Sequence, residues 1–144
     1  MDREQEQPMG NPHLGQSGSY NSEDLSEIED QRSIFVTFPN PHKDMDYLIT
    51  STTDEFTTLC PVTGQPDFAT ITIETTPDEL CIELKSLKMY LMSFRNRGEF
   101  HEQVAGRITK DIIAVIKPRK LRVIGDFTVR GGIATRVVFE YPQK

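Results

Sequence analysis

The chain has 144 residues, with 16 lysine and arginine residues against 22 aspartate and glutamate residues, and a formal net charge of −6. This length suits one domain with its own core, and net acidity disfavours direct nucleic-acid binding, which needs a basic surface. There is no apolar run of membrane-spanning length, no signal-peptide pattern and no disulfide framework, so we expect a cytoplasmic protein with no membrane partner.

Residues 1–33 are predicted to form a disordered acidic tail. They hold eight acidic and two basic side chains, which accounts for the whole net charge, and they are rich in Gln, Gly, Ser, Asn and Pro. Such a segment buries too little apolar surface to offset the entropy lost on ordering. It could be a partner-binding arm or a solvated extension. Residues 34–144 are expected to form a single domain.

The first elements of this domain are two strands joined by a loop. Residues 47–59 are rich in Thr, Ile, Phe and Leu, which favours a strand. Residues 60–67 contain two prolines and a glycine, which is typical of a loop. Apolar and polar residues then alternate over 68–75, as in a half-buried strand.

Two helices follow the strands. Apolar residues at helical spacing predict a helix over 85–96, and Gly98 is expected to end it as a left-handed cap. A second apolar stripe over 104–115 predicts another helix, which Pro118 ends.

Two further strands close the chain. Alternation over 121–129 and 133–140 predicts them, and Gly131 and Gly132 suit a tight turn with positive φ between them. The order of elements predicts an α+β fold with helices on one face of an antiparallel sheet. Because the other face is half polar, we expect association through the sheet edges.

Cys60 and Asp67 stand at the two ends of the first loop. A cysteine thiolate is a strong nucleophile, although a single cysteine can also be an inert core residue. Because the loop joins adjacent strands, Asp67 can approach Cys60 and donate protons to a reacting atom. The alternative is a turn aspartate that accepts hydrogen bonds from backbone N–H groups.

His101 and Glu102 begin the second helix, and Glu83 precedes the first. The two oxygens of a carboxylate match the paired N–H donors of a guanine-like base, and a histidine can move protons or orient a substrate. Glu102 could instead only complement the helix dipole, and Glu83 could be a solvent-facing strand end.

Other chemistries are less well supported by the sequence. Four basic residues on or near the first helix form either a solvated face or a phosphate site: Lys85, Lys88, Arg95 and Arg97. No GxGxxG or Walker A motif is present. Cys60, Cys81 and His101 could supply three zinc ligands, but they lack the paired spacing of known zinc sites, and we expect no metal.

Taken together, the motifs resemble one family. The segment from Glu55 to Ala69, EFTTLCPVTGQPDFA, resembles the nucleophile loop of the 7-cyano-7-deazaguanine reductases. The segment ELKSLKMY, residues 83–90, resembles the family signature Glu-(Ser/Leu)-Lys-(Ser/Ala)-hydrophobic-Lys-(Leu/Tyr)-aromatic, with Met89 as a conservative departure. Phe-His-Glu at 100–102 and FTVRGG at 127–132 extend the likeness over residues 38–140.

The resemblance implies a tunnelling fold, as in GTP cyclohydrolase I: a four-stranded antiparallel sheet with two helices between strands two and three. It implies stacked homo-oligomeric rings with active sites between subunits. It also implies NADPH-dependent reduction of the nitrile of 7-cyano-7-deazaguanine to the primary amine through a covalent cysteine thioimidate, in the biosynthesis of the tRNA nucleoside queuosine.

The same resemblance implies roles for individual residues. Cys60, Asp67 and His101 would be the nucleophile, the proton donor and a proton-transfer aid. Five residues would bind the substrate: Ile82, Glu83, Leu84, His101 and Glu102. Three would bind NADPH: Lys85, Arg130 and Gly131.

Two other functions fit the same fold. One is a zinc-dependent cyclohydrolase, which would require a bound metal. The other is a non-catalytic ring that binds a purine or pterin and in which Cys60 is inert.

Overall fold

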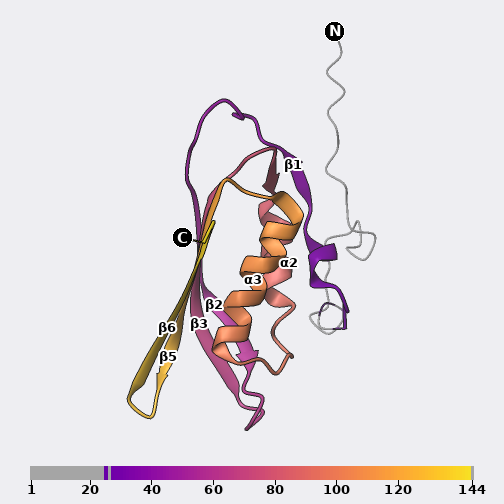
Figure 1. The fold of residues 1–144 in the computed structure, drawn as a ribbon. Coiled ribbons are helices and arrows are strands. Elements are labelled where there is room, and N and C mark those ends of the chain that lie inside the picture. Colours follow the sequence, from indigo (N-terminus) through magenta and orange to yellow (C-terminus); the bar gives the residue numbers. More distant parts are fainter. Residues whose placement is uncertain (1–24, 26, 144) are drawn as a thin grey trace.

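The computed structural model describes residue 25 and residues 27–143, and it has an α+β fold with an antiparallel sheet, as expected. The main sheet has the order β2-β3-β5-β6. Its strands are β2 (Ile49–Leu59), β3 (Pro66–Thr76), β5 (Lys120–Arg130) and β6 (Ile133–Tyr141). Helices α2 (Leu84–Met92) and α3 (His101–Ile116) lie between β3 and β5 along the chain and cover one face of this sheet (Figure 1).

The core lies between the sheet and the helices. Alternate residues of β3 point toward the helices, and Ala69, Ile71 and Ile73 are all buried. Ile108 and Ile112, one helical turn apart on α3, are completely buried opposite them. The periodicities of two in the strands and 3.6 in the helices therefore predicted the inward faces.

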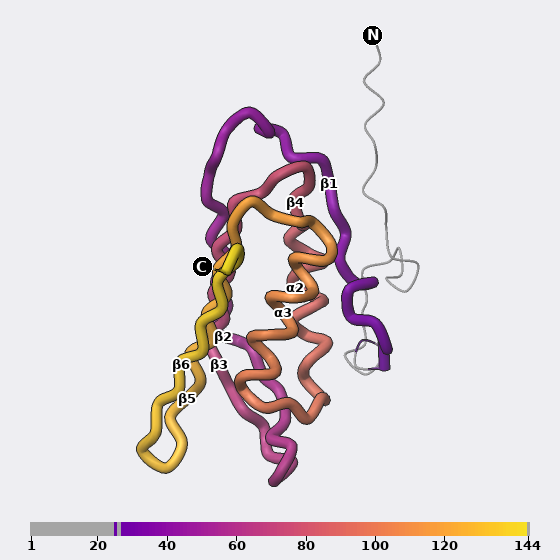
Figure 2. Tube along the Cα trace, viewed as in Figure 1, coloured from indigo at the N-terminus to yellow at the C-terminus, as the bar shows by residue number. Residues whose placement is uncertain are grey.

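Three short elements were not predicted. Strands β1 (Thr37–Pro39) and β4 (Leu80–Ile82) pair antiparallel in a small second sheet. A 3-10 helix, η1 (Gln31–Ile34), lies on the outer side of the helix layer (Figures 1 and 2). These elements have only three or four residues each, too few to show a hydrophobic period.

The packed part of the chain begins before the boundary that composition suggested at residue 34. Leu25 and Ile34 belong to the core, and the Gln31 side chain donates a hydrogen bond of 2.7 Å to Ser93 Oγ. A few apolar anchors are enough to attach this segment, although its average composition is polar. The rest of the expected tail, residues 1–24 and 26, lies outside the described residues.

The glycine-based predictions had different outcomes. Gly131 and Gly132 have φ of 55° and 77° and form the turn between β5 and β6, as predicted. The prediction that Gly98 caps the first helix was wrong, because α2 ends at Met92 and Gly98 has no positive φ. Its neighbours instead extend beside the end of β2: Leu59 N–H donates to Arg97 O at 2.9 Å, and Glu99 N–H donates to Leu59 O at 3.1 Å.

The sheet face opposite the helices is half polar, as expected, because Ile124 and Val138 pair between two ion pairs. Arg122 faces Glu140 at 3.4 Å, and Arg136 faces Asp126 at 3.5 Å, across the β5–β6 pair. Along the described part of the chain, no helix combines the length and the apolar character needed to span a membrane.

Candidate active site

Cys60 lies in a tight loop directly after β2. Its backbone N–H donates to Gln65 O at 2.8 Å, and Gly64 N–H donates to Cys60 O at the same distance. Gly64 has a φ of 71°, a conformation that glycine adopts without strain. The loop therefore returns at once into β3, and it leaves Cys60 partly exposed.

The same loop stabilises the thiolate form of Cys60. A hydrogen bond from the Thr63 side chain is the main cause that lowers the pKa of the Cys60 thiol, with further contributions from the backbone N–H groups of Thr63 and Val62. Burial and the nearby charge of Asp67 act in the opposite direction. A lowered thiol pKa increases the thiolate fraction near neutral pH, and the thiolate is the nucleophilic form.

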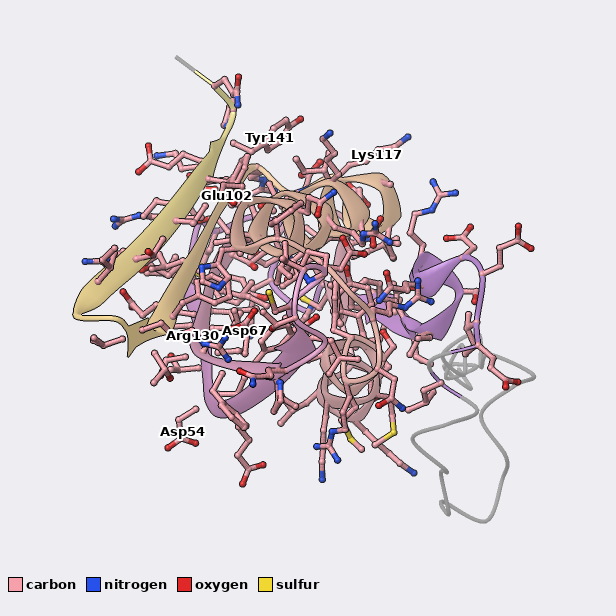
Figure 3. The ribbon with its side chains drawn as sticks, turned by 90° about the horizontal axis from the view of Figure 1, so that it is seen from below. Asp54, Asp67, Glu102, Lys117, Arg130 and Tyr141 are labelled. Atoms are coloured by element: carbon pink, nitrogen blue, oxygen red, sulfur yellow. The ribbon has the colours of Figure 1, made fainter. Side chains whose placement is uncertain are left out.

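Asp67, near the start of β3, forms the centre of a charged cluster with Arg130 and His101. Its side chain is only 8% exposed. Arg130 Nη2 lies 2.9 Å from Asp67 Oδ1 and also donates to the carbonyl of Pro66. His101 Nε2 lies 3.7 Å from Asp67 Oδ2. Figure 3 shows Asp67 and Arg130 side by side. His101 and Asp67, which the sequence did not place together, are thus neighbours within one chain.

His101 is the first residue of α3, and its imidazole stacks on the ring of Phe127 from β5. The ring centroids are 3.8 Å apart and the planes differ by 9°. Glu102, the next residue, is exposed in the first turn of the same helix. Its carboxylate is free to complement the helix dipole and to accept hydrogen bonds from a ligand.

Four of the predicted site residues lie at the opposite end of the helix layer: Ile82, Glu83, Leu84 and Lys85. In Figure 2 the loop after β2, the start of α3 and the β5–β6 hairpin lie at the lower end, whereas β4 and the start of α2 lie higher. Leu84 lines the same groove as Ile73. Asp67 and Ile73 are six positions apart on β3, roughly 20 Å.

Glu83 has a structural task in addition to any binding role. Its carboxylate accepts hydrogen bonds from the backbone N–H groups of Lys85 at 2.7 Å and Ser86 at 2.8 Å. It is therefore the N-cap of α2, rather than a strand end that faces solvent.

A groove of about 270 Å³ lies between α2 and β2. Leu87, Leu91 and Phe56 give it an apolar lining, and Lys88 and Arg95 add positive charge. Both basic residues were considered as phosphate ligands from the sequence.

The ligand set of the zinc alternative is dispersed. Within residues 25 and 27–143, no group of three or more His, Cys, Asp or Glu side chains is placed to hold a metal ion. Cys81 is buried in β4, where its sulfur lies 3.8 Å from the Tyr47 hydroxyl.

Sequence reasoning did not single out Thr63 or Phe127. Thr63 follows Cys60 by three positions within a Pro/Gly turn, a spacing that could have suggested a contact with the thiol. Phe127 was expected only as an inward residue of its strand, because sequence spacing does not show which ring stacks on His101.

Residues 66–144 match the family model described as QueF-like protein. The chain is 56% identical over 108 residues to the NADPH-dependent 7-cyano-7-deazaguanine reductase of Anaeromyxobacter sp. (strain Fw109-5), covering 75% of this chain and 88% of that relative. It is 54% identical over 107 residues to the protein of the same name from Nitrosococcus oceani, covering 74% and 83%.

A solved structure shares the fold. The archaeosine synthase QueF-Like in its apo form matches with a TM-score of 0.61 and 22% identity, over 65% of this chain and 91% of that chain. At this identity the likeness concerns the fold alone.

Proposed function

The chain belongs to the family of NADPH-dependent 7-cyano-7-deazaguanine reductases, and on that premise we propose that it reduces the nitrile of 7-cyano-7-deazaguanine to the primary amine. The observation that carries the proposal is the short loop that joins Cys60 to Asp67. It combines a thiol of lowered pKa with a buried carboxylate that lies beside His101.

In the first proposed step, the Cys60 thiolate attacks the nitrile carbon. The new C–S bond forms as one C–N π bond opens, and the nitrogen takes up a proton, which gives a covalent thioimidate. Asp67 is assigned as the proton donor to this nitrogen. Because its carboxylate is paired with Arg130, it must first take up a proton, and His101 is assigned to deliver it.

Conversion of a nitrile to a primary amine consumes two hydrides and two protons. NADPH supplies the hydrides. After the first reduction, the C–S bond breaks and the thiolate leaves, so that Cys60 is regenerated and an imine remains for the second reduction. Free water would hydrolyse that imine, so the pocket must exclude water during both reductions.

Glu102 and Glu83 are assigned to the deazaguanine base, together with Ile82, Leu84 and His101. Glu102 lies next to His101 and is free to accept two N–H donors.

The NADPH contacts are assigned to Lys85, Arg130 and Gly131, and the groove beside α2 extends this set with Lys88 and Arg95. Basic side chains over an apolar lining suit a ligand that carries both phosphates and a flat ring.

We further propose the tunnelling fold and its stacked rings for this chain, with the product used in queuosine biosynthesis. The separation of Glu83 from Cys60 supports active sites between subunits. The start of α2 and the loop after β2 lie at opposite ends of the helix layer, so a Glu83 that binds the same base as Cys60 would come from a neighbouring subunit.

The proposal is tested by intact-protein mass after mixing with 7-cyano-7-deazaguanine without NADPH. We expect an adduct of one equivalent that NADPH discharges. The adduct should persist in Cys81→Ala, the matched control at the other cysteine, and should be absent in Cys60→Ala. Binding without an adduct would contradict the covalent step and would favour the non-catalytic ring.

A further inference from the structure

The orientation of His101 is not fixed by a hydrogen bond. Among the described residues, its ring-stacking partner is Phe127 and its charged neighbour is the Asp67 carboxylate. At 3.7 Å, the separation of Nε2 and Oδ2 is an ion-pair distance that is too long for a hydrogen bond. The imidazole is a quarter exposed, so solvent offers it other rotamers. The stack on Phe127 is the contact that covers a whole face of the imidazole, with the two ring planes only 9° apart.

Gly125 provides the room for this stack. A Cβ at Gly125 would lie 2.9 Å from Cε2 of Phe127, closer than real Cβ atoms approach a non-bonded neighbour. Gly125 and Phe127 point to the same face of β5, because they are two residues apart on a strand. With no side chain at Gly125, the Phe127 ring can lie over that position, where it is almost completely buried beside the imidazole.

We propose that Phe127 is a positioning residue that holds the His101 imidazole toward the Asp67 carboxylate, in the space left by Gly125. The proposal deepens the proposed function, because its kinetic consequence depends on the proton-transfer role of His101. The stack itself is a geometric claim that can be tested without any substrate.

The physical effect is a restriction of rotamers. When the His101 imidazole lies flat against the buried Phe127 ring, its Nε2 stays directed toward Asp67. Without the stack, the imidazole would spend part of its time in rotamers that point into solvent. A face-to-face aromatic contact also tolerates a protonated imidazole, which is attracted to the ring electrons. Phe127 can thus hold His101 before and after it transfers a proton.

The first test is NMR of protein with labelled histidine. The chain has three histidines, so the Cε1–H signal of His101 can be assigned by its loss in His101→Ala. We expect this signal to be shifted upfield by the Phe127 ring current and to move downfield in Phe127→Leu. A wild-type signal at the position found in unfolded protein would overturn the proposal.

The second test is turnover. We expect Phe127→Leu to lower the rate of nitrile reduction about tenfold, since loss of a stacked pair reduces the population of the productive orientation. The same substitution should have no further effect in a His101→Ala background. Equal losses in the two backgrounds, or an unchanged rate in Phe127→Leu, would overturn the proposal. If His101→Ala has no measurable turnover, the turnover rate of Phe127→Leu is compared with that of the control variant Gly106→Ala instead.

Gly125→Ala is the second variant, in case Phe127→Leu folds poorly. It should displace the Phe127 ring and move the His101 signal in the same direction. The matched control is Gly106→Ala on α3, where a Cβ would press on another ring, Phe139, at 3.3 Å. Gly106→Ala should leave both the His101 signal and the turnover unchanged, and an equal effect of the two alanines would overturn the proposal.

Failure of the proposed function would look different. In that case wild-type protein would not reduce the nitrile. The His101 signal would still lie upfield in the wild type and would still move downfield in Phe127→Leu.

Discussion

Cys60 obtains its thiolate-stabilising hydrogen bonds from its own loop. The Thr63 side chain and two successive backbone N–H groups point at one sulfur, and the closed turn from Cys60 to Gln65 keeps them there. The donors and the thiol lie within four consecutive residues, so they are brought together when the turn forms. The lowered pKa of Cys60 is thus a local property of its loop, whereas the proposed reaction also needs Asp67, His101 and a bound substrate.

Thr63→Val tests this local activation. The hydroxyl donor favours the charged thiolate, so its removal should raise the pKa of Cys60. The rate of alkylation by iodoacetamide rises as the thiol ionises, so its midpoint should move to higher pH in the variant. Mass spectrometry of peptides separates Cys60 from the buried Cys81.

The matched control for this measurement is Thr128→Val, which is exposed on the opposite face of the sheet. It should leave the midpoint unchanged. A Thr63→Val midpoint at or below the wild-type value would show that the backbone donors alone set the ionisation of Cys60.

At the scale of elements, residues with a long hydrophobic period could be predicted and short connections could not. Strand β3 and helix α3 each bury one face over 11 and 16 residues, so their sequences repeat the burial pattern several times. The residues 97–99 carry no such pattern. They pair with Leu59 because that strand end has backbone groups to satisfy, which is a tertiary effect that Gly98 does not encode.

In the candidate site, too, local features could be predicted from the sequence and contacts between distant segments could not. The proximity of Asp67 to the Cys60 loop could be predicted, because a short loop between adjacent strands brings its ends together. The pairing of Arg130 with Asp67 was not predicted, because it depends on the register between β3 and β5 and on the length of an arginine side chain. The N-cap role of Glu83 could have been read from its place before a helical stripe.

Ile34→Ala tests whether η1 belongs to the cooperative core despite its polar neighbours. Ile34 is fully buried, so truncation should cost about 2–5 kcal/mol of unfolding free energy. Ile133→Ala is the matched control, because the same side chain is 69% exposed there, and it should cost less than about 1 kcal/mol. Urea unfolding measures both. Equally small losses of unfolding free energy in the two variants would show that η1 is not part of the cooperative unit.

At the scale of the whole molecule, the distribution of the predicted site residues is the main constraint. One set gathers at the end of the sheet where the β2–β3 loop lies, and the other surrounds the start of α2 (Figure 2). The sheet also has two outer strands, β2 and β6, and a half-polar face that the helices do not cover (Figure 1). Unpaired strand edges of this kind are suited to association. Both features agree with the proposal that a second copy of the chain completes the active site.

Subunit complementation tests that proposal. Cys60→Ala lacks the proposed nucleophile, and Glu83→Ser lacks the distant carboxylate but keeps a good N-cap for α2. Each variant alone should be inactive. When they are co-expressed in equal amounts, a site formed by two chains is intact whenever Cys60 comes from one variant and Glu83 from the other, so about a quarter of the wild-type activity should return.

Recovery on co-expression requires that the two residues come from different chains, because no single chain in the mixture carries both. If one chain supplied both residues, every site would lack one of them and activity would stay absent. Native mass spectrometry with one variant tagged shows whether mixed assemblies have formed. Mixed assemblies without activity would therefore contradict a site shared between two chains, whereas activity of Glu83→Ser alone would place Glu83 outside the site and limit it to its role as the N-cap of α2.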